Sequence, residues 1–332
     1  MNTIYEQILA RLEAGQGSLL VSRYSPNGLE RTLVEEALDA EAEGGLHFTQ
    51  DGAQLTLTER FLPKPRLIIL GGGHIALPLA DLGKTLGFEV WVYDDRPSFA
   101  NPGRFPAAHT VICDDFEHMA ARLNFRRGDY VTVLTRGHKH DTMCLQALLD
   151  GVGEVPQYVG MIGSKRRIAI VKQEVTEVTG RAELLDNLYA PIGLPIGSVT
   201  PEEIALSIMA EIVQHKRLGP DGTRGKMPQE GGVDPELFAW LARKKDTKAA
   251  LVTIVASKGS TPRETGAKMA ITATGETVGS IGGGCAEGEV IIRARDVMDQ
   301  NGYHLMEVDM ADSAEEDGMV CGGVMTVLIE AI

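Results

Sequence analysis

The sequence predicts an α/β protein in which a doubly wound parallel sheet is joined to a smaller α+β domain. Three observations predict this fold class. Short apolar runs alternate with helical stretches in the first two thirds of the chain, a glycine-rich loop links the first of these runs to a helix, and a second group of strands with one amphipathic helix follows. Apolar strands that alternate with helices are typical of a parallel sheet covered on both faces. The 332 residues correspond to about two domains at roughly 100–200 residues per domain.

Residues 1–61 are predicted to form a short N-terminal segment. LLVSRY (19–24) is rich in strand-forming residues, and QLTLTERF (54–61) alternates with a period of two, as a half-buried strand does. GAQLTLTE (52–59) can be laid over GVMTVLIE (323–330). This similarity suggests that the segment is a degenerate copy of the C-terminal domain without its cysteines.

Residues 62–217 are predicted to form the doubly wound domain. Its expected strands are RLIIL (66–70), EVWVY (89–93), HTVIC (109–113), YVTVLT (130–135) and YVGMI (158–162). Helices are expected at about 74–86, 116–123, 141–150 and 164–179. The segment that begins at Thr200 predicts the clearest helix, with Thr200 as its N-cap, Pro201 in its first turn and Glu203 closing a capping box.

Residues 218–235 are rich in glycine and proline and are interpreted as a linker. Asp234 is expected to cap a short helix that begins with Pro235. The second domain, 236–332, is predicted to contain strands and one helix. The strands are ALVTIVAS (250–257), AKMAIT (267–272) and GVMTVLIEAI (323–332), and the helix spans about 286–300.

Composition excludes several classes of partner. The formal net charge is −14 and aromatic residues make up 5%, which disfavours nucleic acid and anionic lipid as partners. No apolar run is long enough for a transmembrane helix, and the N-terminus does not resemble a signal peptide. The four cysteines form no CxxC motif, so free thiols and a cytoplasmic location are expected. Of these, Cys113 and Cys144 are interpreted as structural.

A glycine-rich loop follows the first predicted strand of the doubly wound domain. Gly71, Gly73 and Ala76 match the G-x-G-x-x-A fingerprint of a Rossmann-type fold, and His74 lies within the loop. Glycine permits a tight turn and close approach to a diphosphate, and the following helix offers free N–H groups to an anion. Asp94 ends the next strand, where it is expected to accept hydrogen bonds from ribose hydroxyls.

Other polar loops are expected at the same edge of the sheet, where ligands bind in open α/β folds. The candidate binding residues on them are Arg96, Arg136, His138, His140, Ser164, Lys165 and Arg166. Basic residues at a helix start favour an anion site there. His138 and His140 also allow a metal site, but Asp141 is better used as a helix N-cap, so ligand hydrogen bonding is preferred and no metal is expected.

The C-terminal domain contains a cysteine beside three glycines. Gly282, Gly283 and Gly284 allow the backbone to form an anion-binding concavity, and Cys285 would then begin a helix, a position that lowers the pKa of a thiol. Glu287 would work against this effect if it lay close. The remaining candidates in this domain are Cys321, Ser260 and Arg263.

The motifs in these loops form a signature. In the C-terminal domain they are GSTPR (259–263), GSIGGGCAE (279–287) and CGG (321–323). In the Rossmann-type domain they are GGGHIA (71–76), DDRP (94–97), RFP (104–106), TRGHKHD (135–141), GMIGSKRR (160–167), PIGLPIG (191–197) and TPEEIALSIMAEI (200–212). Together they resemble the XdhC/CoxI family, which comprises maturation factors for xanthine dehydrogenase and related molybdenum hydroxylases. The domain order departs from the family, because the cysteine-bearing domain usually comes first.

The resemblance implies an accessory chaperone that binds molybdenum cofactor (molybdopterin), supports its sulfuration by a cysteine desulfurase and inserts it into an apo-hydroxylase. Cys285, with Cys321 as second choice, would handle the cofactor or its sulfur. A homo-oligomer is expected, because a second chain could complete the missing half. Two other functions stay open: an NAD(P)-dependent oxidoreductase, and a nucleotide-binding adaptor that transfers no cofactor.

Overall fold

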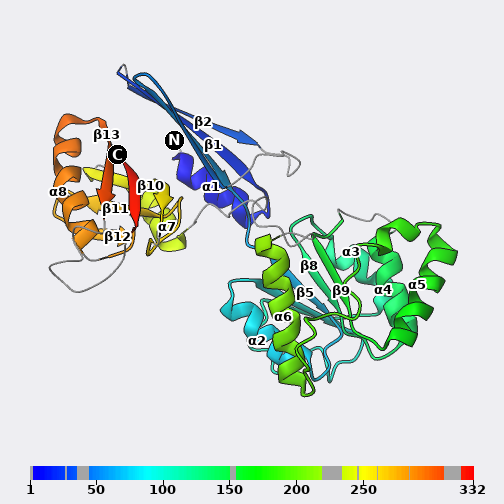
Figure 1. Ribbon diagram of the computed structural model, residues 1–332. Helices are drawn as coiled ribbons and strands as arrows, with labels where there is room; N and C mark the ends of the chain where they lie inside the picture. Colours follow the sequence, from blue (N-terminus) through cyan, green and yellow to red (C-terminus); the bar gives the residue numbers. More distant parts are fainter. Residues whose placement is uncertain are drawn as a thin grey trace. The chain divides into compact units, whose positions relative to one another are not determined.

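The computed structural model describes residues 3–26, 28–35, 45–149, 155–218, 234–244, 247–259, 261–283, 285–309 and 323–332, without the side chains of 183, 184, 285 and 286. The chain divides into two compact units, which are described separately. One consists of Met1–Pro63 together with Pro228–Ile332, and the other of Lys64–Met227. Figure 1 shows the elements of both units.

The Lys64–Met227 unit contains a five-stranded parallel sheet with the order β7-β6-β5-β8-β9. The strands are β5 (Arg66–Leu70), β6 (Glu89–Asp94), β7 (Thr110–Cys113), β8 (Tyr130–Val133) and β9 (Tyr158–Met161). The helices are α2 (Ala76–Thr85), α3 (Met119–Leu123), α4 (His138–Leu149), α5 (Lys165–Thr179) and α6 (Pro201–Leu218), with short 3-10 turns at Phe116–His118 and Ala182–Leu185. This arrangement confirms the predicted doubly wound sheet.

The apolar run of β5 explains why the sheet is covered on both faces. Leu67 and Ile69 pack into a core with residues of α2 and α6, whereas Ile68 and Leu70 point to the other face and pack with residues of α3, α4 and α5. The chain runs outward from β5 through β6 to β7 and then returns to β8 on the other side of β5. The boundary between β5 and β8 is therefore the switch point, where ligands of such sheets bind.

The capping signals predicted at Thr200 and Asp234 are confirmed. Thr200 Oγ1 accepts a hydrogen bond from the Glu203 amide (3.3 Å), and Glu203 Oε2 accepts one from the Thr200 amide (3.0 Å). The amide donors on Val199 and Thr200 lower the pKa of Glu203. Asp234 caps α7 (Pro235–Arg243) as expected. The segment interpreted as a linker lies almost wholly outside the described residues.

The other unit contains two antiparallel sheets, which confirms the additional α+β part of the fold. The first sheet has the order β2-β1-β4-β3, from β1 (Ser18–Ser25), β2 (Gly28–Glu35), β3 (Leu46–Asp51) and β4 (Gln54–Phe61). The second has the order β12-β11-β10-β14-β13, from β10 (Ala249–Lys258), β11 (Lys268–Thr272), β12 (Thr277–Gly279), β13 (Tyr303–Asp309) and β14 (Val324–Ala331). Helix α8 (Cys285–Gln300) packs on one face of the second sheet.

The N-terminal segment packs on the opposite face of this second sheet. Side chains of α1 (Ile4–Glu13) and of the first sheet share two apolar clusters with residues of α7, β10, β11 and β14. Buried polar contacts join the same parts: Glu330 accepts hydrogen bonds from Tyr24 (2.9 Å) and Arg31 (2.6 Å), and Glu59 pairs with Lys268. Residues 1–63 and the C-terminal domain therefore form one unit in the structure.

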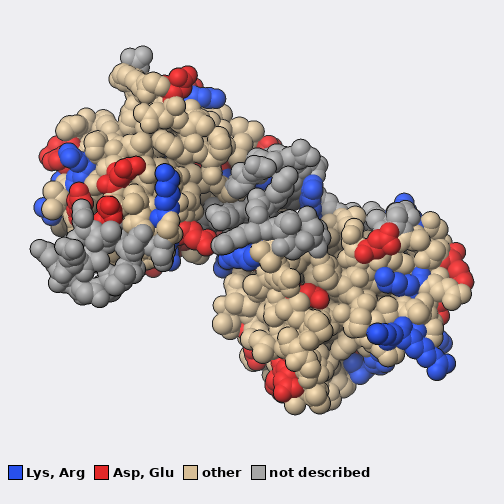
Figure 2. Space-filling view, in the orientation of Figure 1, with Lys and Arg blue, Asp and Glu red and all other residues tan. Residues whose placement is uncertain are grey.

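The charged residues of the chain are spread over both units. On the face shown in Figure 2, acidic and basic side chains are interspersed, and a group of basic side chains lies at the lower right of the Lys64–Met227 unit. Basic residues thus gather locally although the net charge is −14. No helix in the described ranges is both long and apolar enough to cross a membrane.

Candidate functional site

The candidate site lies at the carboxyl edge of the parallel sheet, where the loops after β5, β6, β8 and β9 meet. In the loop after β5, Gly71 and Gly72 are required by packing. A Cβ atom on Gly71 would lie 2.5 Å from the carbonyl oxygen of Leu134, and one on Gly72 would lie 2.1 Å from that of Phe99. At Gly73 a Cβ atom would meet nothing within 4 Å. The open space that a ligand needs is therefore found at Gly73, the second glycine of the fingerprint. Ala76 is buried at the start of α2, and His74 is exposed.

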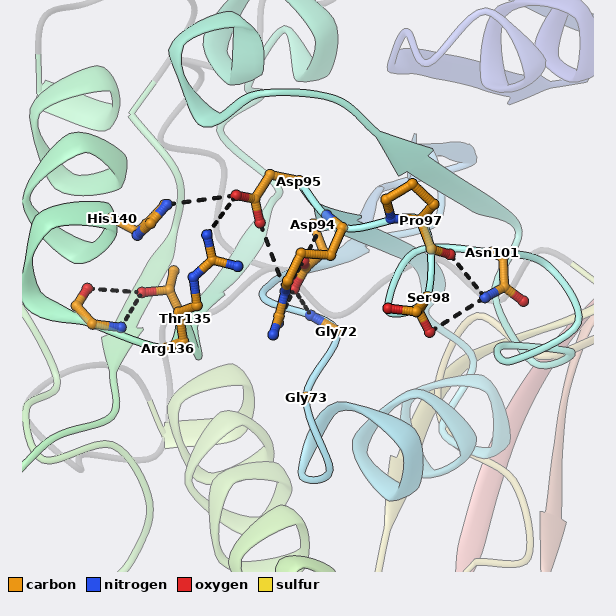
Figure 3. Close-up of polar contacts among 12 residues, drawn as sticks. Gly72, Gly73, Asp94, Asp95, Pro97, Ser98, Asn101, Thr135, Arg136 and His140 are labelled. Atoms are coloured by element: carbon orange, nitrogen blue, oxygen red, sulfur yellow. Dashed lines mark hydrogen bonds and ion pairs between the residues drawn. The ribbon is translucent and has the colours of Figure 1, made fainter.

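Asp94 does not present its carboxylate as the sequence predicts. It is 1% exposed. Its Oδ2 accepts hydrogen bonds from the Gly72 amide (2.8 Å) and Arg96 Nη2 (2.9 Å), and its Oδ1 accepts from the amide and Nε of Arg96 (3.0 and 2.8 Å). Burial alone would raise the pKa of Asp94, but these donors outweigh it and lower the pKa. Because both oxygens are already used, Asp94 braces the glycine loop and has no free acceptor for ribose hydroxyls (Figure 3).

Arg104 is a site residue that the sequence reasoning did not select. Its guanidinium donates to the carbonyl oxygens of Gly72 (3.3 Å) and Gly73 (3.5 Å). Arg96 and Arg104 both pack on the ring of Phe99, with Cζ atoms 3.7 and 5.2 Å from its centroid. Arg104 therefore lies beside the open glycine, and Arg96 packs on the same aromatic ring. The RFP motif marked this position, but only the tertiary structure shows that Arg104 reaches the loop.

The loops after β6 and β8 meet through an ion pair. Asp95 Oδ2 lies 2.8 Å from Arg136 Nη2 and 3.6 Å from His140 Nε2, and Asp95 Oδ1 lies 3.7 Å from Arg96 Nε (Figure 3). The structure thus brings together three of the predicted binding residues, Arg96, Arg136 and His140. They surround an acidic residue that the sequence reasoning did not single out.

Asp141 is not the N-cap of its helix, contrary to the prediction. Helix α4 begins at His138, and Asp141 lies buried in its first turn. Its carboxylate accepts hydrogen bonds from Thr135 Oγ1 (2.5 Å) and Arg167 Nε (2.7 Å). Desolvation raises the pKa of Asp141, and the hydrogen bonds from Thr135 and Arg167 partly oppose that rise. Asp141 therefore ties the loop after β8 to the start of α5. Within the described part of the chain, His138 and His140 belong to no metal-binding group of three or more His, Cys, Asp or Glu residues.

The loop after β9 presents two of its basic residues to solvent. Ser164 caps α5 by accepting from the Arg167 amide (3.3 Å). Lys165 and Arg166 are exposed, whereas Arg167 is occupied by Asp141. The predicted anion site at this helix start therefore retains Lys165 and Arg166 as its available cations.

The glycine-rich loop before α8 binds the carboxylate of Glu287, a residue in the first turn of that helix. Glu287 Oε1 accepts hydrogen bonds from Ser280 Oγ (2.8 Å) and from the amides of Ile281 (3.1 Å) and Gly283 (2.9 Å). The Gly283 amide, one of the groups that the sequence predicts for an external anion, is thus used by Glu287. A Cβ atom on Gly282 would lie 2.7 Å from Pro262 Cγ, so this loop packs against the turn that carries Arg263, which is exposed.

The structure describes the side chains of Cys113 and Cys144 but not those of Cys285 and Cys321. Cys285 is the first residue of α8, but its side chain lies outside the described residues, as do Gly284, Ser260 and Cys321. Cys144 is fully buried, and burial raises the pKa of its thiol. Cys113 is exposed at the end of β7, although it was interpreted as structural.

Replacing Glu287 with alanine is expected to loosen the loop before α8. The substitution leaves the donors of Ser280, Ile281 and Gly283 without their acceptor, a loss of about 1–3 kcal/mol in the free energy of unfolding. Amide hydrogen exchange should accelerate at Ile281 and Gly283. Glu289→Ala, at an exposed position of the same helix, is the control and should change neither quantity. Unchanged exchange at Gly283 in Glu287→Ala would contradict this role.

Comparison with known proteins finds family models that match two consecutive parts of the chain. The model described as the XdhC Rossmann domain matches residues 67–212, and the model described as the XdhC and CoxI family matches 242–309. A Bacillus subtilis protein whose name describes a probable xanthine dehydrogenase subunit is 34% identical over 48% of this chain and 45% of its own length. An Escherichia coli protein named YqeB and described as uncharacterized is 30% identical over 51% of this chain and 30% of its own length.

A solved structure agrees with these matches. The crystal structure of a Bacillus halodurans protein described as a xanthine dehydrogenase is 29% identical, with a TM-score of 0.50, and the match covers 63% of this chain and 65% of that one. This chain spans less than half the length of the two curated relatives. The two family models follow one another along the chain, Rossmann-type part first, and together they match more than half of it. This chain is a member of the XdhC and CoxI family.

Proposed function

We propose that this chain is an accessory factor that binds molybdenum cofactor, supports its sulfuration by a cysteine desulfurase and inserts it into xanthine dehydrogenase or a related molybdenum hydroxylase. The observation that carries the proposal is the position of Cys285. It begins a sixteen-residue helix directly after a glycine-rich loop. A helix N-terminus lowers the pKa of a thiol, and the Glu287 carboxylate held in the same loop opposes that effect. A thiolate is the form that binds a soft metal centre or accepts sulfur.

The residues at the carboxyl edge of the parallel sheet fit the phosphate of such a cofactor. The space over Gly73 is open to a ligand, and Arg104 lies against the carbonyl oxygens of Gly72 and Gly73. Guanidinium groups form strong charge-assisted hydrogen bonds with phosphate. Arg104 and Arg136 would hold the phosphate of a ligand bound at this edge of the sheet. When bound, the cofactor supplies the redox chemistry of the hydroxylase that receives it.

An NAD-dependent oxidoreductase is the less favoured function. In NAD-binding sheets of this type, an acidic side chain at the end of the second strand accepts from the ribose hydroxyls. Here that residue, Asp94, already accepts four hydrogen bonds from Gly72 and Arg96. A nucleotide-binding adaptor that transfers no cofactor is the third candidate, and nucleotide binding without bound pterin would select it.

The test is the small-molecule content of the protein purified from cells that make molybdopterin. Mass spectrometry of the released molecules should find the pterin in the unmodified protein and only background amounts in Cys285→Ala. Cys113→Ala is the matched control, because it removes an exposed thiol from the other unit. Equal pterin content in Cys285→Ala and in the unmodified protein would refute the assignment of Cys285. Reduction of NAD by a small alcohol, abolished by Gly73→Trp, would favour the oxidoreductase.

A further inference from the structure

The ion pair between Asp95 and Arg136 crosses the switch point of the parallel sheet. Asp95 follows β6 and Arg136 follows β8, and β5 lies between these two strands. The pair therefore lies across the carboxyl end of β5, which is where ligands enter sheets of this topology. A carboxylate at this place needs an explanation, because it would repel the phosphate of an approaching ligand.

The surroundings of Asp95 resemble a phosphate site more than a structural salt bridge. Arg136 and His140 approach the same carboxylate oxygen, at 2.8 and 3.6 Å, and Arg96 approaches the other at 3.7 Å. The imidazole of His140 packs edge-on against the ring of Phe116, 5.1 Å between centroids, which orients it. Basic side chains from the loop after β6, the loop after β8 and the first turn of α4 thus converge on one carboxylate.

The other acidic residues at this edge have a different role. Asp94 is buried and accepts four hydrogen bonds, and Asp141 is buried and accepts hydrogen bonds from Thr135 and Arg167. If either carboxylate moved away, its donors would lose their acceptor. Asp95 is 18% exposed and its partner Arg136 is 46% exposed. Because Arg136 reaches solvent, its guanidinium stays hydrated when the pair opens, so opening this pair costs less than breaking the buried contacts of Asp94 and Asp141.

The residues that precede Asp95 and Arg136 are both held by hydrogen bonds. Asp95 directly follows Asp94, which is held by Gly72 and Arg96. Arg136 directly follows Thr135, whose hydroxyl donates to Asp141 and whose carbonyl oxygen accepts from Arg167 (3.0 Å). Rotation of the Asp95 side chain alone would therefore free Arg136 and His140, with no loop rearrangement.

We propose that Arg136 and His140 form a phosphate subsite at the switch point, and that the carboxylate of Asp95 occupies it until a phosphorylated ligand displaces it. The ligand class is a phosphate oxyanion, carried either by a nucleoside diphosphate group or by a single phosphate ester such as that of a pterin cofactor. A phosphate has more acceptor oxygens and more charge than a carboxylate, so it forms the stronger contacts with the same donors. The proposal rests on the proposed function only for the identity of the natural ligand.

Isothermal titration of the full chain with ADP, inorganic phosphate and adenosine at constant ionic strength tests the subsite. Asp95→Asn removes the competing charge and should bind ADP or phosphate about three- to tenfold more tightly than the unmodified protein. Arg136→Gln should weaken the same binding, and adenosine should show no difference between variants. ADP preferred over phosphate would assign a nucleoside diphosphate, and equal affinity would assign a lone phosphate group.

The matched control is Asp114→Asn. Asp114 follows β7 and also pairs with one arginine and one histidine, Arg122 (2.8 Å) and His118 (3.0 Å), away from the switch point. This substitution should leave ADP and phosphate affinity unchanged. Weaker or unchanged binding in Asp95→Asn, or no binding by any variant, would overturn the proposal. Pterin content measured on the same variants separates this result from the proposed function, since loss of pterin in Cys285→Ala does not depend on Asp95.

Discussion

Gly72→Ala is expected to destabilise the Lys64–Met227 unit by about 3 kcal/mol or more, because the new methyl group meets backbone. The added Cβ atom would lie 2.1 Å from the carbonyl oxygen of Phe99, which cannot rotate away as a side chain can. The amide of Gly72 also donates to Asp94, so a shift of the loop would break the bond that braces it. The substitution therefore disturbs packing and hydrogen bonding at once.

Gly73→Ala is the matched control for Gly72→Ala. A Cβ atom at Gly73 meets nothing within 4 Å, so the free energy of unfolding should change by about 0.5 kcal/mol or less. Denaturant unfolding can be followed in this unit alone with Trp91 as reporter, in a chain that carries Trp240→Phe. Equal effects of the two substitutions would show that the loop is not packed as described. Gly73→Ala should instead weaken ligand binding, because it fills the open space.

Lys268→Met is expected to destabilise the other unit by about 3–5 kcal/mol, because it leaves a buried carboxylate without its partner. Lys268 and Glu59 are 3% and 8% exposed, and Lys268 also donates to Thr253 (2.8 Å). Since Glu59 belongs to the N-terminal segment and Lys268 to the C-terminal domain, the loss should loosen the attachment of that segment. Urea unfolding of a chain that carries Trp91→Phe, followed by the fluorescence of Trp240, measures the loss in the free energy of unfolding.

Two variants control this experiment. Lys248→Ala removes an exposed ion pair, in which Lys248 Nζ lies 2.8 Å from Asp299 Oδ1 and the two side chains are 53% and 80% exposed. Its effect should stay below about 1 kcal/mol. The double variant Glu59→Leu with Lys268→Met removes both charges and should recover much of the loss, because an apolar pair can replace a buried ion pair. A small effect of Lys268→Met alone would mean that water reaches Glu59.

Local patterns predicted the elements and the edge of the sheet that carries the site. The apolar run at 66–70 predicted a strand of a parallel sheet covered on both faces, and alternate residues of this strand do face two cores. The capping box of Thr200 and Glu203 predicted where α6 begins. These predictions hold because strand and helix signals act between residues close in sequence. The glycine loop was located for the same reason.

The partners of the charged groups could not be predicted in this way. Asp94 was expected to face a ligand but is enclosed by Gly72 and Arg96, and Asp141 was expected to cap a helix but holds Arg167. Whether a carboxylate faces solvent, an amide or a guanidinium depends on which loops meet, and this is decided by chain segments far apart in sequence.

The sequence by itself determined the order of the strands and helices of the parallel-sheet unit, the glycine-rich loops and the family. Only the tertiary structure decided that residues 1–63 complete the C-terminal unit and that Glu287 fills the loop before α8. It also decided that Asp95 reaches across β5 to Arg136. The physical reason is that backbone hydrogen bonding and apolar periodicity are local, whereas ion pairing and core formation require the folded chain to bring distant residues together.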